Sequence, residues 1–331
     1  MKITYIRSSS LNCFDLCEMQ YTLNYVLGIP QKTGRKAILG TMTHKVLEIL
    51  AQCKKTLQNN LSIYDDDICG KVQASEMFNP ELIGRIIGEV FIHYKDKSDH
   101  VFTNADLKNI GEWVYKTLNF NNGLFDPRKR VIVEVEAPFN FEVEDRWAQY
   151  DYGENDLGQL RLKGTIDLIT QVREGIYEGI DWKTGRRISW STGEEKTVDK
   201  FMVDPQLRIY HMAMMRLYPH VKQFFPTIFY CNDGGPFTVP LSNNDVEETK
   251  LMLKKTFNDV QKCTVPVLKG GGSHWFCSKV CSFGRTPSDK CPGVSQCKYI
   301  SDRIKKDGID VVSKEETIVG HSVSFYQNPG A

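Results

Sequence analysis

The sequence has almost no excess of charge of either sign, because 42 Lys and Arg residues stand against 41 Asp and Glu residues, a formal net charge of +1 at pH 7. This balance argues against a uniformly basic surface that would bind polyanions indiscriminately, although it permits a local basic groove. No stretch approaches the roughly eighteen uncharged apolar residues that a membrane span requires. The first ten residues, MKITYIRSSS, lack the apolar core of a signal peptide. We therefore predict a soluble, intracellular, cytoplasmic protein.

Ten cysteines in such a chain need an explanation, because disulfides are disfavoured inside cells. Four of them crowd into 21 residues near the C-terminus with the spacing C-x3-C-x9-C-x5-C, and two more lie near the start of the chain. These are Cys277, Cys281, Cys291 and Cys297, and Cys13 and Cys17. The other four cysteines are isolated, and we interpret them as ordinary buried thiols. Four thiolates as close together as the C-terminal group could form a structural zinc site on their own.

Apolar periodicity predicts a helical first part of the chain and a strand-rich second part. Residues 40–55 have helical spacing, and the pattern stays helical with polar interruptions over residues 56–125. After Asp126-Pro127, the segments VIVEVEAPFNFEV, LRLKGTIDLITQV and GIYEGIDWK predict three consecutive strands. A helix is expected to begin at Asp204-Pro205, with Asp as N-cap and Pro at the first helical position. Two shorter strands, FPTIFYC and FTVPL, and the amphipathic helix NNDVEETKLMLKKTFNDVQKC follow.

The most informative stretch is GTIDLI followed by IDWKTG. Asp167 lies inside an apolar strand, and Asp181 ends the next strand fourteen residues later. Lys183 is two residues further on, so its side chain points to the same face as that of Asp181. If the strands pair as a hairpin, the two carboxylates offer hard oxygen ligands to Mg²⁺ or Mn²⁺. The lysine can orient and help to deprotonate an attacking water, and it can offset charge that develops on a phosphate. Alternatively, Asp167 caps a turn and Asp181 pairs with Lys183 at the surface, because isolated D-x-K triplets are common by chance.

Four motifs in order along the chain, GTMTHKVLE, GTIDLI, IDWKTG and QLRIYH, resemble those of the PD-(D/E)XK nuclease superfamily. They are most similar to its RecB-type branch, which includes the CRISPR-associated iron–sulfur exonucleases and the AddB-type nuclease domains. The resemblance spans about residues 8–297, although residues 56–125 match no motif. It implies an α/β, restriction-endonuclease-like core with a mixed central sheet flanked by helices, and a helical region inserted before the first core strand.

The resemblance also implies roles for individual residues of a catalytic centre. Asp167, Asp181 and Lys183 would be the catalytic residues. The two aspartates would bind Mg²⁺ or Mn²⁺ together with the backbone carbonyl of Trp182 and the side chain of His44, which matches the early G-x-x-x-H motif. Without the resemblance, His44 is interpreted as a histidine on the flank of a core helix.

Two further positions match the Q-x-x-x-Y motif of the family. Gln206 and Tyr210 lie four residues apart on one helix face and would help to position the catalytic strand and DNA. Their alternative interpretation is that they are half-buried polar groups on a packing helix. Glu134 and Glu136 lie where relatives sometimes carry an acidic residue, but both could equally face solvent.

For the cysteines, the resemblance offers a second interpretation besides zinc. Phe14, Cys17 and Tyr21 fit the frame F-x-x-C-x-x-x-Y, in which one N-terminal cysteine joins three C-terminal cysteines to bind a [4Fe–4S] cluster. The favoured ligands are Cys17, Cys277, Cys281 and Cys297, with Cys291 as the substitute. Such a cluster would have a structural role, because it would close a loop of roughly 260–280 residues and so remove chain entropy from the unfolded state.

Together these features predict a metal-dependent DNA nuclease, an exonuclease on single-stranded DNA ends that acts in recombination, repair or phage DNA processing in a bacterial or phage-infected cell. No G-x-x-x-x-G-K-[ST] sequence occurs, so any unwinding would need a helicase or recombination partner. The alternatives are a structure-selective endonuclease, an RNA-cleaving relative, or a non-catalytic iron–sulfur DNA-binding scaffold. The expected segments are 1–55 with the first cluster cysteine and the histidine motif, a helical insertion at 56–125, the nuclease core at 126–265, a Cys-rich metal-cluster segment at 266–301, and a polar, partly disordered tail at 302–331.

Overall fold

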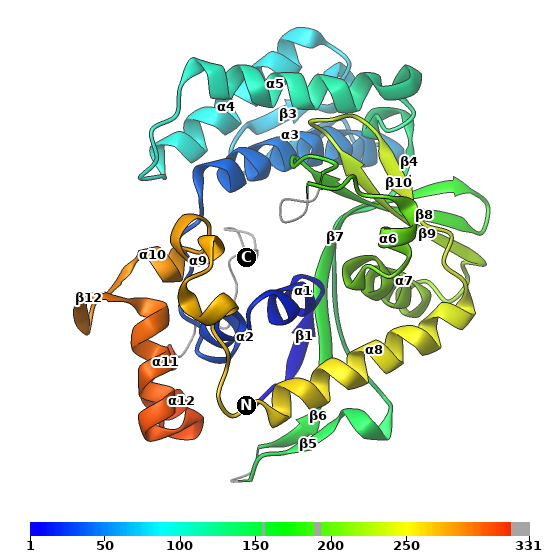
Figure 1. Cartoon of the computed structure of the whole chain (residues 1–331). Helices are drawn as coiled ribbons and strands as arrows, with labels where there is room; N and C mark the ends of the chain where they lie inside the picture. The colour runs from blue at the N-terminus through cyan, green and yellow to red at the C-terminus, as the bar shows by residue number, and fades with distance from the viewer. Residues whose placement is uncertain (154–155, 189–192, 319–331) are drawn as a thin grey trace. The chain divides into compact units, whose positions relative to one another are not determined.

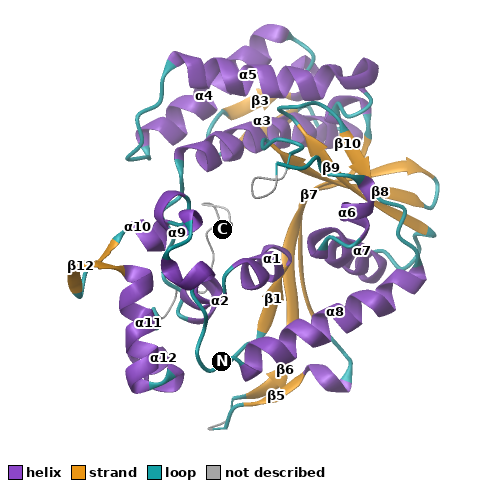
Figure 2. Ribbon diagram, in the orientation of Figure 1, coloured by secondary structure: helices purple, strands orange, loops and turns teal. Residues whose placement is uncertain are grey.

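The computed structural model describes residues 1–153, 156–188 and 193–318, and the chain divides into two compact units (Figure 1; Figure 2). We call the first the terminal unit; it consists of Met1–Thr33, Asn140–Gly164 and the chain from Glu247 onward. The second is the central unit, which consists of Gly34–Phe139 and Thr165–Val246. Each unit is therefore assembled from segments that are far apart in the sequence.

A mixed sheet forms the framework of the central unit. Strands β7 (Arg161–Arg173) and β8 (Ile176–Lys183) form an antiparallel hairpin, and β9 (Gln223–Tyr230) lies parallel to β8. β10 (Pro236–Thr238) pairs antiparallel with β9, and β4 (Val131–Glu142) pairs with β7. Residues of β4 and β7 also belong to the terminal unit. The predicted mixed sheet is confirmed.

Helices cover both faces of this sheet, as the sequence predicted. Ile180 and Trp182 of β8 are buried in one hydrophobic core with residues of α3 (Arg35–Gln58), α4 (Pro80–Asp96) and α5 (Asn104–Asn119). Asp181, between them, hydrogen-bonds to α7 (Pro205–Leu217). Because neighbouring residues of a strand point to opposite faces, α3 and α7 lie on opposite sides of β8. The remaining short elements of the central unit are η2 (Ala74–Glu76), η3 (Phe120–Gly123), η4 (Pro127–Lys129) and α6 (Val198–Met202).

α7 begins where local sequence predicted. The side chain of Asp204 accepts hydrogen bonds from the backbone N–H groups of Gln206 and Leu207 at 2.9 and 3.2 Å, and Pro205 is the first helical residue. This N-cap satisfies two of the free donors of the first turn. The predicted start of the helix is confirmed, and it fixes the position of the Q-x-x-x-Y motif.

Residues 56–125 are not helical throughout, contrary to our expectation. A hairpin of β2 (Ile63–Asp66) and β3 (Gly70–Gln73) lies between α3 and α4. Its turn is stabilised by Asp66, whose Oδ1 accepts the N–H groups of Ile68 and Cys69, and by Gly70 at a φ of 61°. Local turn chemistry therefore overrides the weak helical period here.

The terminal unit combines short strands with helices from both ends of the chain. β1 (Tyr5–Arg7) pairs parallel with the first residues of β7, and α8 (Asn243–Lys262) packs Phe257 against Trp147 at 6.2 Å between ring centroids. Its other elements near the N-terminus and middle of the chain are α1 (Ser8–Leu16), α2 (Glu18–Tyr21), the π-helical turn η1 (Thr22–Val26), η5 (Arg146–Ala148), β5 (Gln149–Asp151) and β6 (Leu157–Gln159). Those near the C-terminus are η6 (Lys269–Gly272), α9 (Trp275–Lys279), α10 (Ser282–Arg285), β11 (Pro287–Ser288) and β12 (Cys291–Ser295), followed by α11 (Gln296–Asp307) and α12 (Ile309–Glu316).

We expected a polar, partly disordered tail from residue 302, but most of residues 302–316 belong to the two helices α11 and α12. α11 and α12 bury Ile304, Ile309 and Val312, and Gly308 at a φ of 84° separates them. The spacing of these apolar side chains was obscured by the surrounding charged residues. Residues 319–331 lie outside the described part of the chain. Among the described helices, none combines the length and the apolar character that crossing a bilayer requires.

Candidate active site

The β7–β8 hairpin brings the two predicted catalytic carboxylates together. The antiparallel strands pair Leu168 with Ile180. Asp167, which precedes Leu168, and Asp181, which follows Ile180, are therefore neighbours across the hairpin with side chains on one face. The carboxylate of Asp167 also accepts the backbone N–H of Trp182, with 2.8 Å between Oδ2 and N. The hairpin that the sequence suggested is thus formed, and both carboxylates lie at the end where β8 finishes.

Asp181 is buried and surrounded by donors. Its Oδ1 accepts hydrogen bonds from Gln206 Nε2 at 2.8 Å and from the Tyr210 hydroxyl at 3.3 Å. Gln206 Nε2 also donates to the Tyr210 hydroxyl at 2.8 Å. The other oxygen, Oδ2, lies 2.6 Å from the ammonium of Lys183. The Q-x-x-x-Y pair therefore contacts the acidic residue of the D-x-K triplet directly.

His44 reaches the same centre from α3. Its Nδ1 lies 3.4 Å from Asp167 Oδ2, and its ring packs edge-on against Trp182 with centroids 6.2 Å apart. Gly40, one turn earlier on α3, is the glycine of the G-x-x-x-H motif, and its surroundings show why a glycine is needed there. A Cβ at this position would lie 2.8 Å from the hydroxyl oxygen of Thr184, so a side chain there would push α3 away from the end of β8.

The electrostatics of the centre favour a bound cation. Burial raises the pKa of Asp167 to about 6; His44 opposes this rise and Asp181 adds to it. Burial alone would lower the pKa of Lys183, but the carboxylates of Asp181 and then Asp167 outweigh it and raise that pKa. Lys183 is therefore an ammonium ion at neutral pH. It can orient a water or offset charge on a phosphate, but it is a poor proton acceptor.

Two further carboxylates, which sequence reasoning did not assign, belong to the same environment. The pKa of Glu136 on β4 is raised to about 9, first by burial and then by Asp167 and Glu48. Glu48 lies on α3 one turn after His44, and burial raises its pKa as well; Lys45 is its ion-pair partner at 2.9 Å. The centre thus has more carboxylates than cations.

Strand alternation could not have placed Glu136. Its backbone is left-handed, with a φ of 49°, which is uncommon for a residue other than glycine. The buried apolar residues Ile132 and Val135 are three positions apart, whereas a regular strand would bury every second residue, so burial along β4 departs from simple alternation. For Glu48, the available signal was its i+4 spacing from His44 within GTMTHKVLE.

The donor set fits Mg²⁺ or Mn²⁺, which prefer carboxylate oxygens and accept an imidazole nitrogen. Within residues 1–153, 156–188 and 193–318, no three His, Cys, Asp or Glu side chains are already arranged as ligands around one point. The carboxylates instead contact Lys183, His44 and the N–H of Trp182. The fit therefore depends on the chemistry of the side chains, and a divalent ion would offset the burial and the repulsion from Asp181 that raise the pKa of Asp167.

Removing the donor of Gln206 tests whether this side chain supports the centre. We expect Gln206→Met to raise the Mg²⁺ concentration that gives half-maximal cleavage by about 10- to 100-fold, because supporting hydrogen bonds hold a metal-binding carboxylate in its orientation. The measurement is a metal titration of the cleavage rate. Gln223→Met, at an exposed glutamine of the same unit, is the matched control. Equal metal dependence in the two variants would contradict the role given to Gln206.

The terminal unit brings the four favoured cysteines close to one another. Cys17, Cys277, Cys281 and Cys297 are all buried. Burial raises the pKa of the Cys297 thiol, and the nearby sulfurs of Cys281, Cys17 and Cys277 raise it further. Burial likewise raises the pKa of Cys277, and the sulfurs of Cys17 and Cys281 add to this rise. Cys291, on β12, is only half-buried and perturbs none of these thiols.

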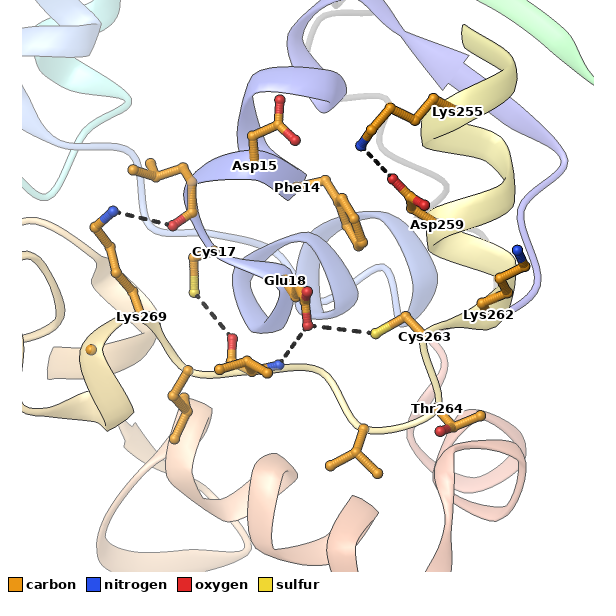
Figure 3. Close-up of a pocket in the computed structure, with 15 residues that line it drawn as sticks. Phe14, Asp15, Cys17, Glu18, Lys255, Asp259, Lys262, Cys263, Thr264 and Lys269 are labelled. Atoms are coloured by element: carbon orange, nitrogen blue, oxygen red, sulfur yellow. Dashed lines mark hydrogen bonds and ion pairs between the residues drawn. The ribbon is translucent and has the colours of Figure 1, made fainter. Parts of the chain in front are cut away.

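Backbone groups around these sulfurs suit a thiolate. Burial raises the pKa of Cys281, but the N–H groups of Gly284 and Phe283 act on its sulfur and oppose that rise. Gly284 must lack a side chain, since a Cβ there would lie 2.2 Å from the carbonyl oxygen of Cys277. Figure 3 shows Cys17 beside the segment after α8, where its sulfur lies 3.9 Å from the carbonyl oxygen of Val267. All ten cysteines are free thiols in this structure.

Comparison with known proteins identifies the class to which this fold and site belong. The sequence profile of the PD-(D/E)XK nuclease superfamily matches residues 8–301, so the chain belongs to this superfamily. The curated proteins include none that matches the chain. Among solved structures, a similar chain is the Eubacterium rectale protein named "Putative exonuclease", which is 11% identical with a TM-score of 0.39 and covers 78% of this chain and 80% of its own. A likeness at this level carries no argument about function.

Proposed function

We propose that the protein is a Mg²⁺- or Mn²⁺-dependent deoxyribonuclease that hydrolyses phosphodiester bonds. The observation that carries this proposal is the pairing of Asp167 with Asp181 across the β7–β8 hairpin, with the ammonium of Lys183 at 2.6 Å from Asp181. Membership of the superfamily supports the reaction class. These contacts are unlike the surface ion pair that an accidental D-x-K triplet would give, because the side chain of Asp181 is only 4% exposed.

Asp167 and Asp181 would hold the ion, assisted by His44 and the backbone carbonyl of Trp182. When bound, the ion would lower the pKa of a water and polarise the phosphate. Lys183 would offset the negative charge that develops on the phosphate, because its raised pKa keeps it charged.

Gln206 and Tyr210 would keep the carboxylate of Asp181 in one orientation through their two hydrogen bonds to its Oδ1. Glu136 has a pKa of about 9 and is protonated in the metal-free protein, so it would add negative charge only on ionising beside a bound cation. Glu48 would be a further carboxyl group near the site.

Within this class we propose an exonuclease on single-stranded DNA ends, of the RecB-type branch, that acts in recombination, repair or phage DNA processing. The support is the early histidine, His44, which contacts Asp167, as expected from the exonuclease members that the sequence resembles. Rates on end-labelled linear single strands, circular single strands and RNA would separate exonuclease, endonuclease and ribonuclease action. Faster cleavage of circles or RNA than of linear strands would contradict this substrate.

Asp167→Asn tests the metal and its pH dependence together. In the metal-free protein, Asp167 keeps its proton up to about pH 6, whereas it loses that proton near pH 4 when unfolded. The native state therefore binds more protons between these values, and its stability falls as the pH rises through that window. We expect Asp167→Asn to abolish cleavage yet stabilise the metal-free protein above pH 6 by on the order of 2 kcal/mol.

The measurement is thermal unfolding with and without Mg²⁺ or Mn²⁺, alongside a cleavage assay. The metal should stabilise the wild-type protein above pH 6, less so as the pH falls below 6, and it should not stabilise Asp167→Asn. Asp65→Asn, at an exposed aspartate of the same unit, is the control and should behave as wild type. Metal stabilisation that survives in Asp167→Asn would place the ion elsewhere.

For the terminal unit we propose a structural [4Fe–4S] cluster bound by Cys17, Cys277, Cys281 and Cys297, with zinc as the alternative metal. The mutual effects of these thiols on their pKa values, and the N–H groups that act on the sulfur of Cys281, support this ligand set over one that includes Cys291. The cluster would join the N-terminal segment to the C-terminal segment.

A further inference from the structure

The terminal unit also contains two cations, Arg7 and Lys163, that pair with no carboxylate among the residues that the structure describes, and they lie on the face that β1 and β7 share. The strands pair Tyr5 with Arg161 and Arg7 with Lys163, and paired residues of adjacent strands point to the same face. The ammonium of Lys163 lies 4.6 Å from the ring centroid of Tyr5, and the guanidinium carbon of Arg7 lies 6.0 Å from the same centroid. The intervening Ile6 points to the opposite face and is fully buried.

Neither cation of this group has a carboxylate within ion-pair distance among the described residues. The neighbouring Arg161, in contrast, pairs with Glu142 at 2.7 Å. Burial lowers the pKa of Lys163, and the positive charges of Arg7 and Arg161 lower it further. Two half-buried cations that repel each other reduce the stability of the fold, so their arrangement suits a function better than packing alone.

Two polar atoms in the same place lack hydrogen-bond partners. The hydroxyl of Tyr5 and the Nε of Arg7 are both buried, and neither has a partner at normal hydrogen-bond geometry in the described part of the protein, although the Arg7 side chain is close enough to act on the hydroxyl as a donor. Burial raises the pKa of Tyr5, although Arg7 opposes that rise, so the hydroxyl keeps its proton and remains a donor. The Nε–H of Arg7, the ammonium of Lys163 and the O–H of Tyr5 are all donors, and of these three groups only the Tyr5 hydroxyl can also accept.

The start of α1 supplies further donors of the same kind. This nine-residue helix follows Arg7 directly, and its first turn contains no acidic residue. Its first N–H groups have no partners within the helix, and the helix dipole makes that end favourable for an anion. Ser10 bonds to the backbone of Arg7 through its hydroxyl, which fixes the strand-to-helix junction. Ser9 is exposed at the same turn.

We propose that Arg7, Lys163, Tyr5 and the first turn of α1 bind a backbone phosphate of single-stranded DNA. Arg7 and Lys163 would contact the phosphate oxygens, and the ring of Tyr5 would hold Lys163 in place through a cation–π contact. This inference rests on the proposed function, because it assumes a nucleic-acid substrate.

The test measures DNA binding apart from cleavage, with a fluorescent single-stranded DNA and the full-length protein in EDTA. We expect the double variant Arg7→Gln/Lys163→Gln to lose at least about 10-fold in affinity and to flatten the dependence of log affinity on log salt by about 0.7 per lost phosphate contact. Lys255→Gln is the control; this exposed lysine forms an ion pair with Asp259 in the same unit. Arg7→Lys/Lys163→Arg keeps both charges and should bind as wild type.

Thermal unfolding of each variant separates lost binding from lost folding, and relief of the repulsion predicts that the double glutamine variant is at least as stable as wild type. The proposal is overturned if the double variant binds DNA with the affinity and salt dependence of the Lys255→Gln control. A second outcome would also overturn it: the wild type and the double variant bind DNA equally, but inorganic phosphate stabilises only the wild type. The site would then bind a small anion and not DNA. Normal DNA binding that depends on Arg7 and Lys163, without cleavage in any divalent metal, would support this inference and contradict only the nuclease proposal.

Discussion

Lys183→Met is expected to lower the rate of DNA cleavage by about 100- to 1000-fold, the usual effect of removing one charge-stabilising donor from a catalytic centre. The ammonium lies 2.6 Å from Asp181 Oδ2, and the carboxylates of Asp181 and Asp167 keep it charged. Methionine keeps the length of the side chain but has no charge to place near a phosphate. The measurement is the single-turnover rate on end-labelled single-stranded DNA at saturating Mg²⁺ or Mn²⁺.

The rate is measured at saturating metal because Lys183→Met leaves the buried carboxylate of Asp181 without its cation. This loss destabilises the metal-free protein. A bound ion would compensate, so the melting temperature of the variant should rise more with metal than that of the wild type. Lys200→Met, at an exposed lysine paired with Glu194 in the same unit, is the control. A Lys183→Met rate within about threefold of that control would mean that Lys183 takes no part in the chemistry.

Cys281→Ser is expected to have the largest effect on stability. If a [4Fe–4S] cluster joins Cys17 to the C-terminal cysteines, its loss releases a loop of well over 200 residues, which in the chain-entropy account costs about 5 kcal/mol. Wild-type protein prepared without oxygen should be brown, with absorbance near ~400 nm. The variant should be colourless and should melt at a much lower temperature, as measured by thermal unfolding and iron content.

Cys291→Ser is the matched control, because Cys291 is not among the groups that shift the pKa values of Cys277, Cys281 and Cys297. It should keep the iron content and the melting temperature of the wild type. A colourless wild-type protein that carries one zinc ion would replace the iron–sulfur proposal by the zinc alternative. Loss of the metal in Cys291→Ser, with retention in Cys297→Ser, would exchange the fourth ligand.

The sequence alone located the parts of the site that depend on neighbours in the chain. Alternation in GTIDLI and IDWKTG indicated two strands, and the spacing of Asp181 and Lys183 placed both side chains on one face. The N-cap Asp204 and Pro205 determined where α7 begins, and therefore where Gln206 is placed. These features follow from strand and helix periodicity and from capping, which act within a few residues.

Only the tertiary structure decided which residues join this centre from distant segments. The charge of Asp167 acts on Glu136, whose backbone is left-handed, and no pattern in VIVEVEAPF reveals that irregularity. The hairpin of residues 63–73 depends on a turn at Asp66 that a helical period conceals. The meeting of Cys17 with cysteines about 260 residues later likewise depends on chain topology.

The physical reason is the range of the interactions involved. Helix and strand periods, caps and turns are determined by a few consecutive residues, so a single sequence contains enough information to predict them. Strand register, the approach of α3 to β8 at Gly40, and the choice among five candidate cysteines depend on burial summed over many residues that are distant in the chain. The sequence thus identified the chemical groups of this protein, and long-range packing determined which of them meet.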